Sequence, residues 1–134
     1  MSASLRTVML IDDSDADNFF HGLLIEQAGI AGDVMVFEWA EKALKWLTEN
    51  AGHAVDLILL DINMPRMNGF EFLEAFHALP DMQQGDTRIC MLSSSALDSE
   101  RERALAFPRV SGFLTKPLDD DALGQLGSLR TMSR

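Results

Sequence analysis

Polar residues that can bind ions follow directly after four short apolar runs of the sequence. Asp12 and Asp13 end the first of these runs, Asp61 ends another, and Ser93 and Lys116 end two more. Carboxylates held within a few ångströms of one another repel strongly, so such a cluster is stable mainly when it binds a cation. An oxygen-only ligand set favours Mg²⁺, which keeps several waters and accepts phosphate oxygens. The pattern therefore predicts an open magnesium site suited to a phosphoryl group.

Lysine is scarce in this sequence, and its distribution sharpens that prediction. Lys42 and Lys45 fall on the exposed side of an expected helix, which leaves Lys116 to meet the acidic residues at a strand end. An ammonium there pairs with carboxylates in the resting state and can pair with a phosphoryl oxygen when one arrives. Ser93 adds a hydroxyl donor at the same place.

The apolar runs themselves indicate the elements that position these side chains. They lie at residues 7–11, 34–37, 56–60, 88–92 and 112–115 and lack the polar alternation of half-exposed strands, as expected for a parallel sheet buried on both faces. Each gap between them is long enough for a crossover helix, and helical periodicity recurs in the gaps. The first such stripe is Phe19, Phe20, Leu23 and Leu24. An α/β fold of five strands alternating with five helices is predicted.

The strand order follows from the one run that lacks a small polar residue at its end. Residues 34–37 are followed by Glu38, Trp39 and Ala40. If this second strand lies on the far side of the first, the order is 2-1-3-4-5 and the four polar strand ends become neighbours. Ligands of open parallel sheets bind beyond the carboxyl ends of the strands, at the point where the strand order reverses. We therefore expect a three-layer sandwich with its site at that edge.

Size and charge exclude several kinds of function. The 134 residues have room for one domain, and 11 basic against 21 acidic residues give a net charge of −10, which repels nucleic-acid backbones and anionic membranes. Cys90 lies within an apolar run and cannot form an internal disulfide, which fits a reducing compartment. The sequence shows no signal peptide and no apolar span of membrane length. We expect a cytoplasmic protein with no nucleic-acid partner and no membrane partner.

Four segments together resemble the receiver domain of response regulators in two-component signalling, chemotaxis receivers among them. They are residues 8–13, 57–69, 90–94 and 112–117, each at the expected strand. The resemblance covers nearly the whole chain. It implies a flavodoxin-like (βα)5 fold and a stand-alone receiver domain over residues 1–134, with a core of about 6–130 and no output domain.

The resemblance also implies roles for the acidic residues. Asp61 would be the phosphoacceptor. Asp12, Asp13 and Asp61 would hold Mg²⁺ together with the backbone carbonyl of Asn63. The site would then take its phosphoryl group from a phosphohistidine of a sensor histidine kinase or a histidine phosphotransfer protein.

The same resemblance implies how the modified state is sensed. Ser93 and Lys116 would each bond a phosphoryl oxygen, the Lys116–Pro117 peptide bond would be cis, and Phe113 would be the switch aromatic coupled to Ser93. Phe113 stands where the family more often has Tyr, so only burial of the ring can report the state. The output surface would comprise residues 98–107, 112–115 and 119–130, which would contact a downstream protein target.

The resemblance implies a signalling switch that catalyses its own phosphorylation and dephosphorylation, rather than an enzyme. Other functions remain open on the same residues. A Mg²⁺-dependent phosphohydrolase acting through an aspartyl phosphate would share the nucleophile and the metal, but 134 residues leave no room for a cap domain. A pseudo-receiver that only binds partners would not need the full set of acids, hydroxyl and lysine. A flavodoxin-like electron carrier is disfavoured because the acidic residues 12–17 would repel a flavin phosphate.

Overall fold

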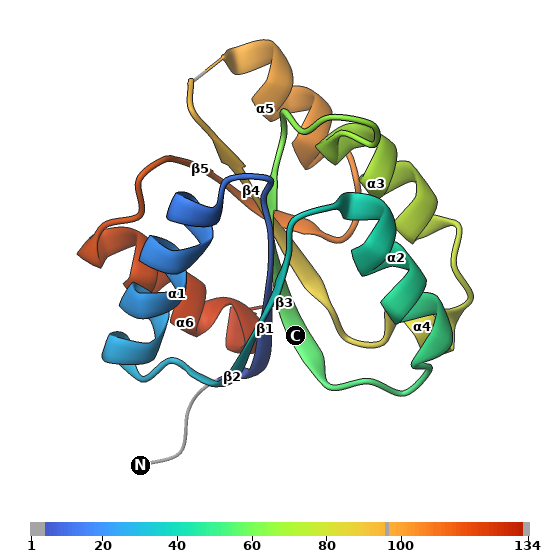
Figure 1. Cartoon of the computed structure of the whole chain (residues 1–134), viewed down its shortest axis with the longest axis horizontal. Coiled ribbons are helices and arrows are strands. Elements are labelled where there is room, and N and C mark those ends of the chain that lie inside the picture. Colours follow the sequence, from blue (N-terminus) through green and yellow to red (C-terminus); the bar gives the residue numbers. More distant parts are fainter. Residues whose placement is uncertain (1–4, 96, 133–134) are drawn as a thin grey trace.

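The computed structural model describes residues 5–95 and 97–132, which contain one five-stranded sheet and six helices (Figure 1). The strands are β1 (Leu5–Ile11), β2 (Ala31–Phe37), β3 (Val55–Asp61), β4 (Arg88–Ser93) and β5 (Val110–Thr115). The helices are α1 (Asp15–Ala28), α2 (Ala40–Glu49), α3 (Gly69–His77), α4 (Asp81–Gln84), α5 (Asp98–Leu105) and α6 (Asp120–Met132). All neighbouring strands are parallel, in the order β2-β1-β3-β4-β5, which confirms the predicted order.

The sheet lies between two layers of helices. Figure 1 shows α1 and α6 on one face and α2, α3 and α5 on the other. Every residue of the central strand β3 is buried, and its side chains alternate between two cores. Ile58 and Leu60 pack with α2 and α3, whereas Leu57 and Leu59 pack with α1 and α6. The predicted three-layer sandwich is therefore confirmed, and the unalternated apolar runs are explained by burial on both faces.

Two helices, α1 and α3, follow the two strands that end at the acidic residues. The Ser14 side chain accepts a hydrogen bond from the Asp17 N–H and caps α1. Asn68 and Glu71 form a reciprocal capping box at the start of α3. Gly69 lets α3 approach β3 closely, because a Cβ atom there would lie 2.6 Å from the Asp61 carbonyl oxygen. The parallel pairing of β1 with β3 holds their ends side by side, and the caps fix where α1 and α3 begin.

The structure differs from the sequence prediction by one element. Helix α4 is a single turn that follows Pro80 and precedes β4, so the described residues hold six helices rather than five. Four residues are too few to give a helical period, which explains why the pattern does not reveal it. The Gln84 side chain donates to the carbonyl of Leu79 and accepts from Arg109, which fixes the turn. None of the described helices is long and apolar enough to cross a membrane.

The apolar stripe Phe19, Phe20, Leu23 and Leu24 correctly predicts a helix, but only Leu24 of it packs against the core. The helix instead exposes Phe19, Phe20 and Leu23 and buries Asn18, His21 and Ile25. The Asn18 side chain donates a 2.8 Å hydrogen bond to the Asp12 carbonyl oxygen, and this bond turns the polar face of the helix toward the strand end. An apolar patch, Phe19, Phe20 and Leu23, therefore lies on the outside of α1.

The predicted output surface corresponds to α5, β5 and α6. Helix α5 contacts β5, and Leu123 and Leu126 of α6 are buried in the core on the α1 side of the sheet. The side chains beyond residue 127, including those of residues 128–130 of the predicted surface, lie outside the described part of the chain.

Candidate functional site

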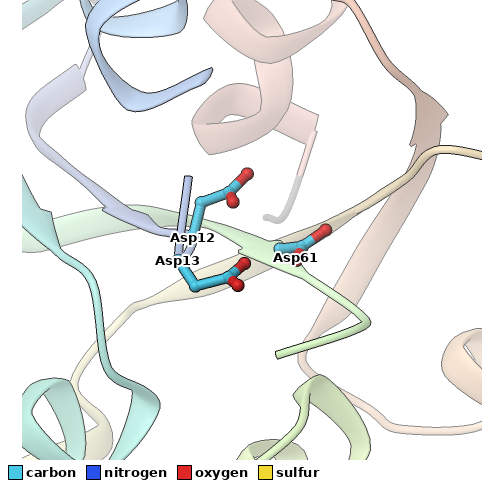
Figure 2. Close-up of side chains that lie close together, drawn as sticks. All are labelled: Asp12, Asp13 and Asp61. Carbon is cyan, nitrogen blue, oxygen red and sulfur yellow. The ribbon is translucent and has the colours of Figure 1, made fainter. Parts of the chain in front are cut away.

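The candidate site lies at the carboxyl ends of β1 and β3, where three carboxylates converge (Figure 2). One oxygen from each of Asp12, Asp13 and Asp61 lies within 4.8 Å of the others. Asp12 and Asp61 are buried, whereas Asp13 is exposed, so the cluster is open to solvent on one side. The sequence prediction that these side chains meet is confirmed.

Lys116, directly after β5, reaches the same cluster. Its Nζ donates to Asp12 Oδ2 at 2.6 Å and to Asp17 Oδ2 at 2.9 Å, and it lies 3.1 Å from Asp61 Oδ1. The backbone N–H of Lys116 donates to the Ser93 carbonyl at 2.8 Å, which fixes the lysine at the end of β4. The Lys116–Pro117 peptide bond is cis, as predicted.

The charges of the cluster change the pKa values of its members. Burial, followed by the negative charge of Asp12, raises the pKa of Asp61 to about 6, although Lys116 opposes the shift. Burial lowers the pKa of Lys116, but its hydrogen bonds to Asp12 and Asp17 outweigh that effect and the pKa lies above its ordinary value. Lys116 is therefore a permanent cation, and the Asp61 carboxylate is ionised at neutral pH yet poorly compensated.

The donor set fits a hard divalent cation. Three carboxylates, one of them exposed, face one ammonium, so the site retains excess negative charge and room for water. Oxygen ligands, an open side and excess negative charge are what Mg²⁺ requires of a protein site. The Asn63 side chain is exposed on the loop after β3. That its backbone carbonyl binds the metal remains a prediction.

Ser93 lies at the end of β4, the strand next to β3, and is buried. Its hydroxyl accepts a 3.1 Å hydrogen bond from the Ser95 N–H and donates to the Ser95 carbonyl. The hydroxyl is therefore engaged with the loop that follows β4. The hydroxyl has a single proton. It can donate that proton to the Ser95 carbonyl or to a ligand in the site, but not to both at once.

Phe113, in β5, packs into the core on the α2 and α3 side of the sheet. Its ring borders a small cavity of about 40 Å³ that is also lined by Leu97, Asp98 and Arg101. The predicted switch aromatic is thus buried in this structure, between the sheet and the start of α5.

Sequence reasoning missed a fourth carboxylate of the site. Asp17, in the first turn of α1, contacts Lys116, whereas the sequence analysis treated it only as part of an acidic segment. The available signal is its place in the first turn of a helix that begins soon after the end of the strand, which keeps its side chain near the residues at that strand end. His21, one further turn along, is buried beneath it, and burial lowers its pKa.

Comparison with known proteins identifies the family of this fold and site. Residues 8–126 match the response regulator receiver domain, and the chain belongs to that family. A crystal structure of a two-component response regulator from Cytophaga hutchinsonii is similar to this chain with a TM-score of 0.88 and 29% identity, covering 96% of this chain and 98% of that one. Receiver domains act as signalling switches and generally bind Mg²⁺ at an acidic pocket like the one formed here.

Curated relatives are longer proteins. The chain is 31% identical over 120 residues to the signal transduction histidine-protein kinase BarA of Escherichia coli K12, covering 90% of this chain and 12% of the kinase. It is 30% identical over 124 residues to the two-component response regulator ORR1 of Oryza sativa subsp. japonica, covering 89% of this chain and 52% of that protein. The similarity thus concerns a receiver segment of each relative.

Proposed function

We propose that this receiver domain accepts a phosphoryl group on Asp61, in a Mg²⁺-dependent reaction, and thereby switches a protein-binding surface. The observation that carries the proposal is the convergence of Asp12, Asp13 and Asp61 with the Lys116 ammonium at one edge of the sheet. Mg²⁺ bound to these carboxylates, with the Asn63 carbonyl, would offset charge on the phosphoryl oxygens.

Asp61 acts as the nucleophile. One of its carboxylate oxygens attacks phosphorus in line, the bond between phosphorus and the donor nitrogen breaks, and the departing imidazole takes a proton from water. The ionised form of Asp61 is available at neutral pH because its raised pKa is still only about 6. Lys116 places its positive charge beside the incoming phosphoryl oxygens. Water later attacks the acyl phosphate, which releases inorganic phosphate and restores the carboxylate.

The switch operates through the end of β4. A phosphoryl oxygen attracts the Ser93 hydroxyl, which then releases the Ser95 carbonyl and moves the loop leading to α5. Phe113 of β5 borders a small cavity with Leu97 and Asp98 at the start of α5, so movement of that loop would change the packing around its buried ring. The surface of α5, β5 and α6 would change accordingly for a downstream protein target.

The phosphoryl donor is a protein that bears a phosphohistidine, on a sensor histidine kinase or a histidine phosphotransfer protein. The similarity to the receiver segment of a histidine kinase supports this class of partner. The donor protein would dock on the apolar patch Phe19, Phe20 and Leu23. Helix α1 begins at the site and carries this patch on its outer side. The net charge of −10 disfavours nucleic-acid backbones and anionic membranes as partners, and the single cysteine, Cys90, fits the reducing compartment of a cytoplasmic protein.

The proposal is tested by measuring intact mass after incubation with Mg²⁺ and a small acyl-phosphate donor. We expect one phosphoryl adduct on the wild type, and none on Asp61→Asn or on the wild type in EDTA. A folded wild-type protein that takes no adduct would contradict phosphorylation by a small acyl phosphate and favour a pseudo-receiver that only binds partners, or a receiver that accepts phosphate only from its own kinase.

A further inference from the structure

Among the described residues, Asp17 is the one carboxylate in contact with Lys116 that has no part in the phosphoacceptor reaction described above. Its Oδ2 accepts a 2.9 Å hydrogen bond from the Lys116 ammonium. Its backbone is fixed by the hydrogen bond from its N–H to the Ser14 side chain, at the N-cap of α1. The contact therefore links the first turn of α1 to the residue that follows β5.

The lysine ammonium donates hydrogen bonds to Asp12 and Asp17 and forms an ion pair with Asp61. An ammonium has three N–H donors, and three carboxylates, those of Asp12, Asp17 and Asp61, lie within 3.1 Å of Lys116 Nζ. A phosphoryl oxygen that binds Lys116 therefore competes with these carboxylates for the ammonium. The Asp17 side chain is 41% exposed, against 4% for Asp12 and 9% for Asp61, so Asp17 regains water most easily when it is released.

We propose that Asp17 is a positioning residue that holds the Lys116 ammonium in the unphosphorylated protein and is displaced when a phosphoryl group binds. This inference rests on the proposed function. The contact stabilises the resting arrangement of the site, and the charge of Asp17 also repels an anionic phosphoryl group. Both effects lower the affinity of the site for that group, so Asp17 tunes how readily the switch is turned on.

The test compares three variants in the full chain. Asp17→Asn removes the charge that holds Lys116, and Asp17→Glu restores it. Asp15→Asn is the matched control, because it removes one negative charge from the same helical turn at a residue that interacts with Glu38 instead. The first measurement is the apparent dissociation constant of beryllofluoride, a phosphoryl analogue, at fixed Mg²⁺. The second is the NMR resonance of the Lys116 ammonium in the metal-free protein.

We expect Asp17→Asn to bind beryllofluoride about twofold to fivefold more tightly than the wild type, the size expected for a partly exposed ion pair. Its Lys116 resonance should shift, while Asp15→Asn and Asp17→Glu stay close to the wild type in both measurements. Equal affinities for the wild type and Asp17→Asn, or an equal gain in Asp15→Asn, would overturn the inference.

A parallel mass measurement separates this inference from the proposed function. If the wild type takes a phosphoryl adduct but Asp17→Asn matches it in analogue affinity, only the role of Asp17 is overturned. If no protein takes an adduct and none binds the analogue, the proposed function is overturned and the role of Asp17 with it.

Discussion

Asp61 combines burial with a nearby like charge, and both disfavour its ionised form. In the folded protein its pKa is raised from 3.8 to about 6. A carboxyl whose pKa is higher when folded than when unfolded stabilises the fold fully at low pH, and that contribution is lost as pH rises through the folded pKa. At neutral pH the ionised Asp61 carboxylate therefore destabilises the metal-free fold, and a bound cation would offset this cost.

Asp61→Asn should accordingly raise the free energy of unfolding of the metal-free protein at pH 7. The gain is about 3 kcal/mol at most, from the size of the pKa shift, and should shrink toward zero as pH falls from 6 to 4. Urea unfolding in EDTA at several pH values measures it. A gain that is the same at pH 4 and pH 7 would contradict the origin assigned to the shift.

The close approach of the start of α3 to the backbone of Asp61 depends on Gly69. Gly69→Ala should destabilise the protein by about 1–3 kcal/mol and reduce phosphorylation, because the added Cβ would meet the Asp61 carbonyl oxygen at 2.6 Å and the backbone has to move. Gly124→Ala is the control, since a Cβ in that position of α6 meets nothing within 4 Å. Thermal unfolding and adduct formation check both variants, and equal effects would count against the close approach.

The apolar patch on α1 is the place where helical periodicity misled the sequence prediction. Apolar residues of α1 occur on more than one face, and the face that turns inward carries Ile25 together with Asn18, whose side chain donates to the Asp12 carbonyl. A side-chain bond to a strand end leaves no periodic trace in the sequence. The outward phenylalanines are then available to a partner.

Phe19→Ser should slow phosphoryl transfer from a phosphohistidine-bearing donor protein that phosphorylates the wild type. Phosphorylation by a small acyl phosphate and thermal stability should stay unchanged, because the Phe19 side chain is 74% exposed. Met82→Ser, at another exposed apolar residue in α4, is the control. Equal transfer rates for Phe19→Ser and the wild type would exclude the patch as the docking place.

Across the whole molecule, the parallel sheet explains why so much of the site was predictable. Parallel strands bring their carboxyl ends to one edge, so the strand order alone places Asp12, Asp61 and Lys116 together. The contact from Asp17 was not predictable in the same way, because it depends on where the first helical turn points. The single-turn helix α4 carries too few residues for any pattern.

Coupling between the site and the distant surface is tested through Ser93. Ser93→Ala should still accept a phosphoryl group, but the NMR shift changes of α5 and β5 on phosphorylation should be reduced, because no hydroxyl remains to exchange the Ser95 carbonyl for a phosphoryl oxygen. The neighbouring Ser94 is exposed, so Ser94→Ala is the matched control. Full shift changes in Ser93→Ala would contradict the proposed route.

The most direct test is to locate the phosphoryl group in the chain. The wild-type protein is phosphorylated with a small acyl phosphate and Mg²⁺, the acyl phosphate is reduced with borohydride, and the converted residue is found by peptide mass mapping. The structure leads us to expect conversion at Asp61 alone. Conversion at Asp12, Asp13 or Asp17, with Asp61 unchanged, would contradict the assignment of Asp61 as the phosphoacceptor.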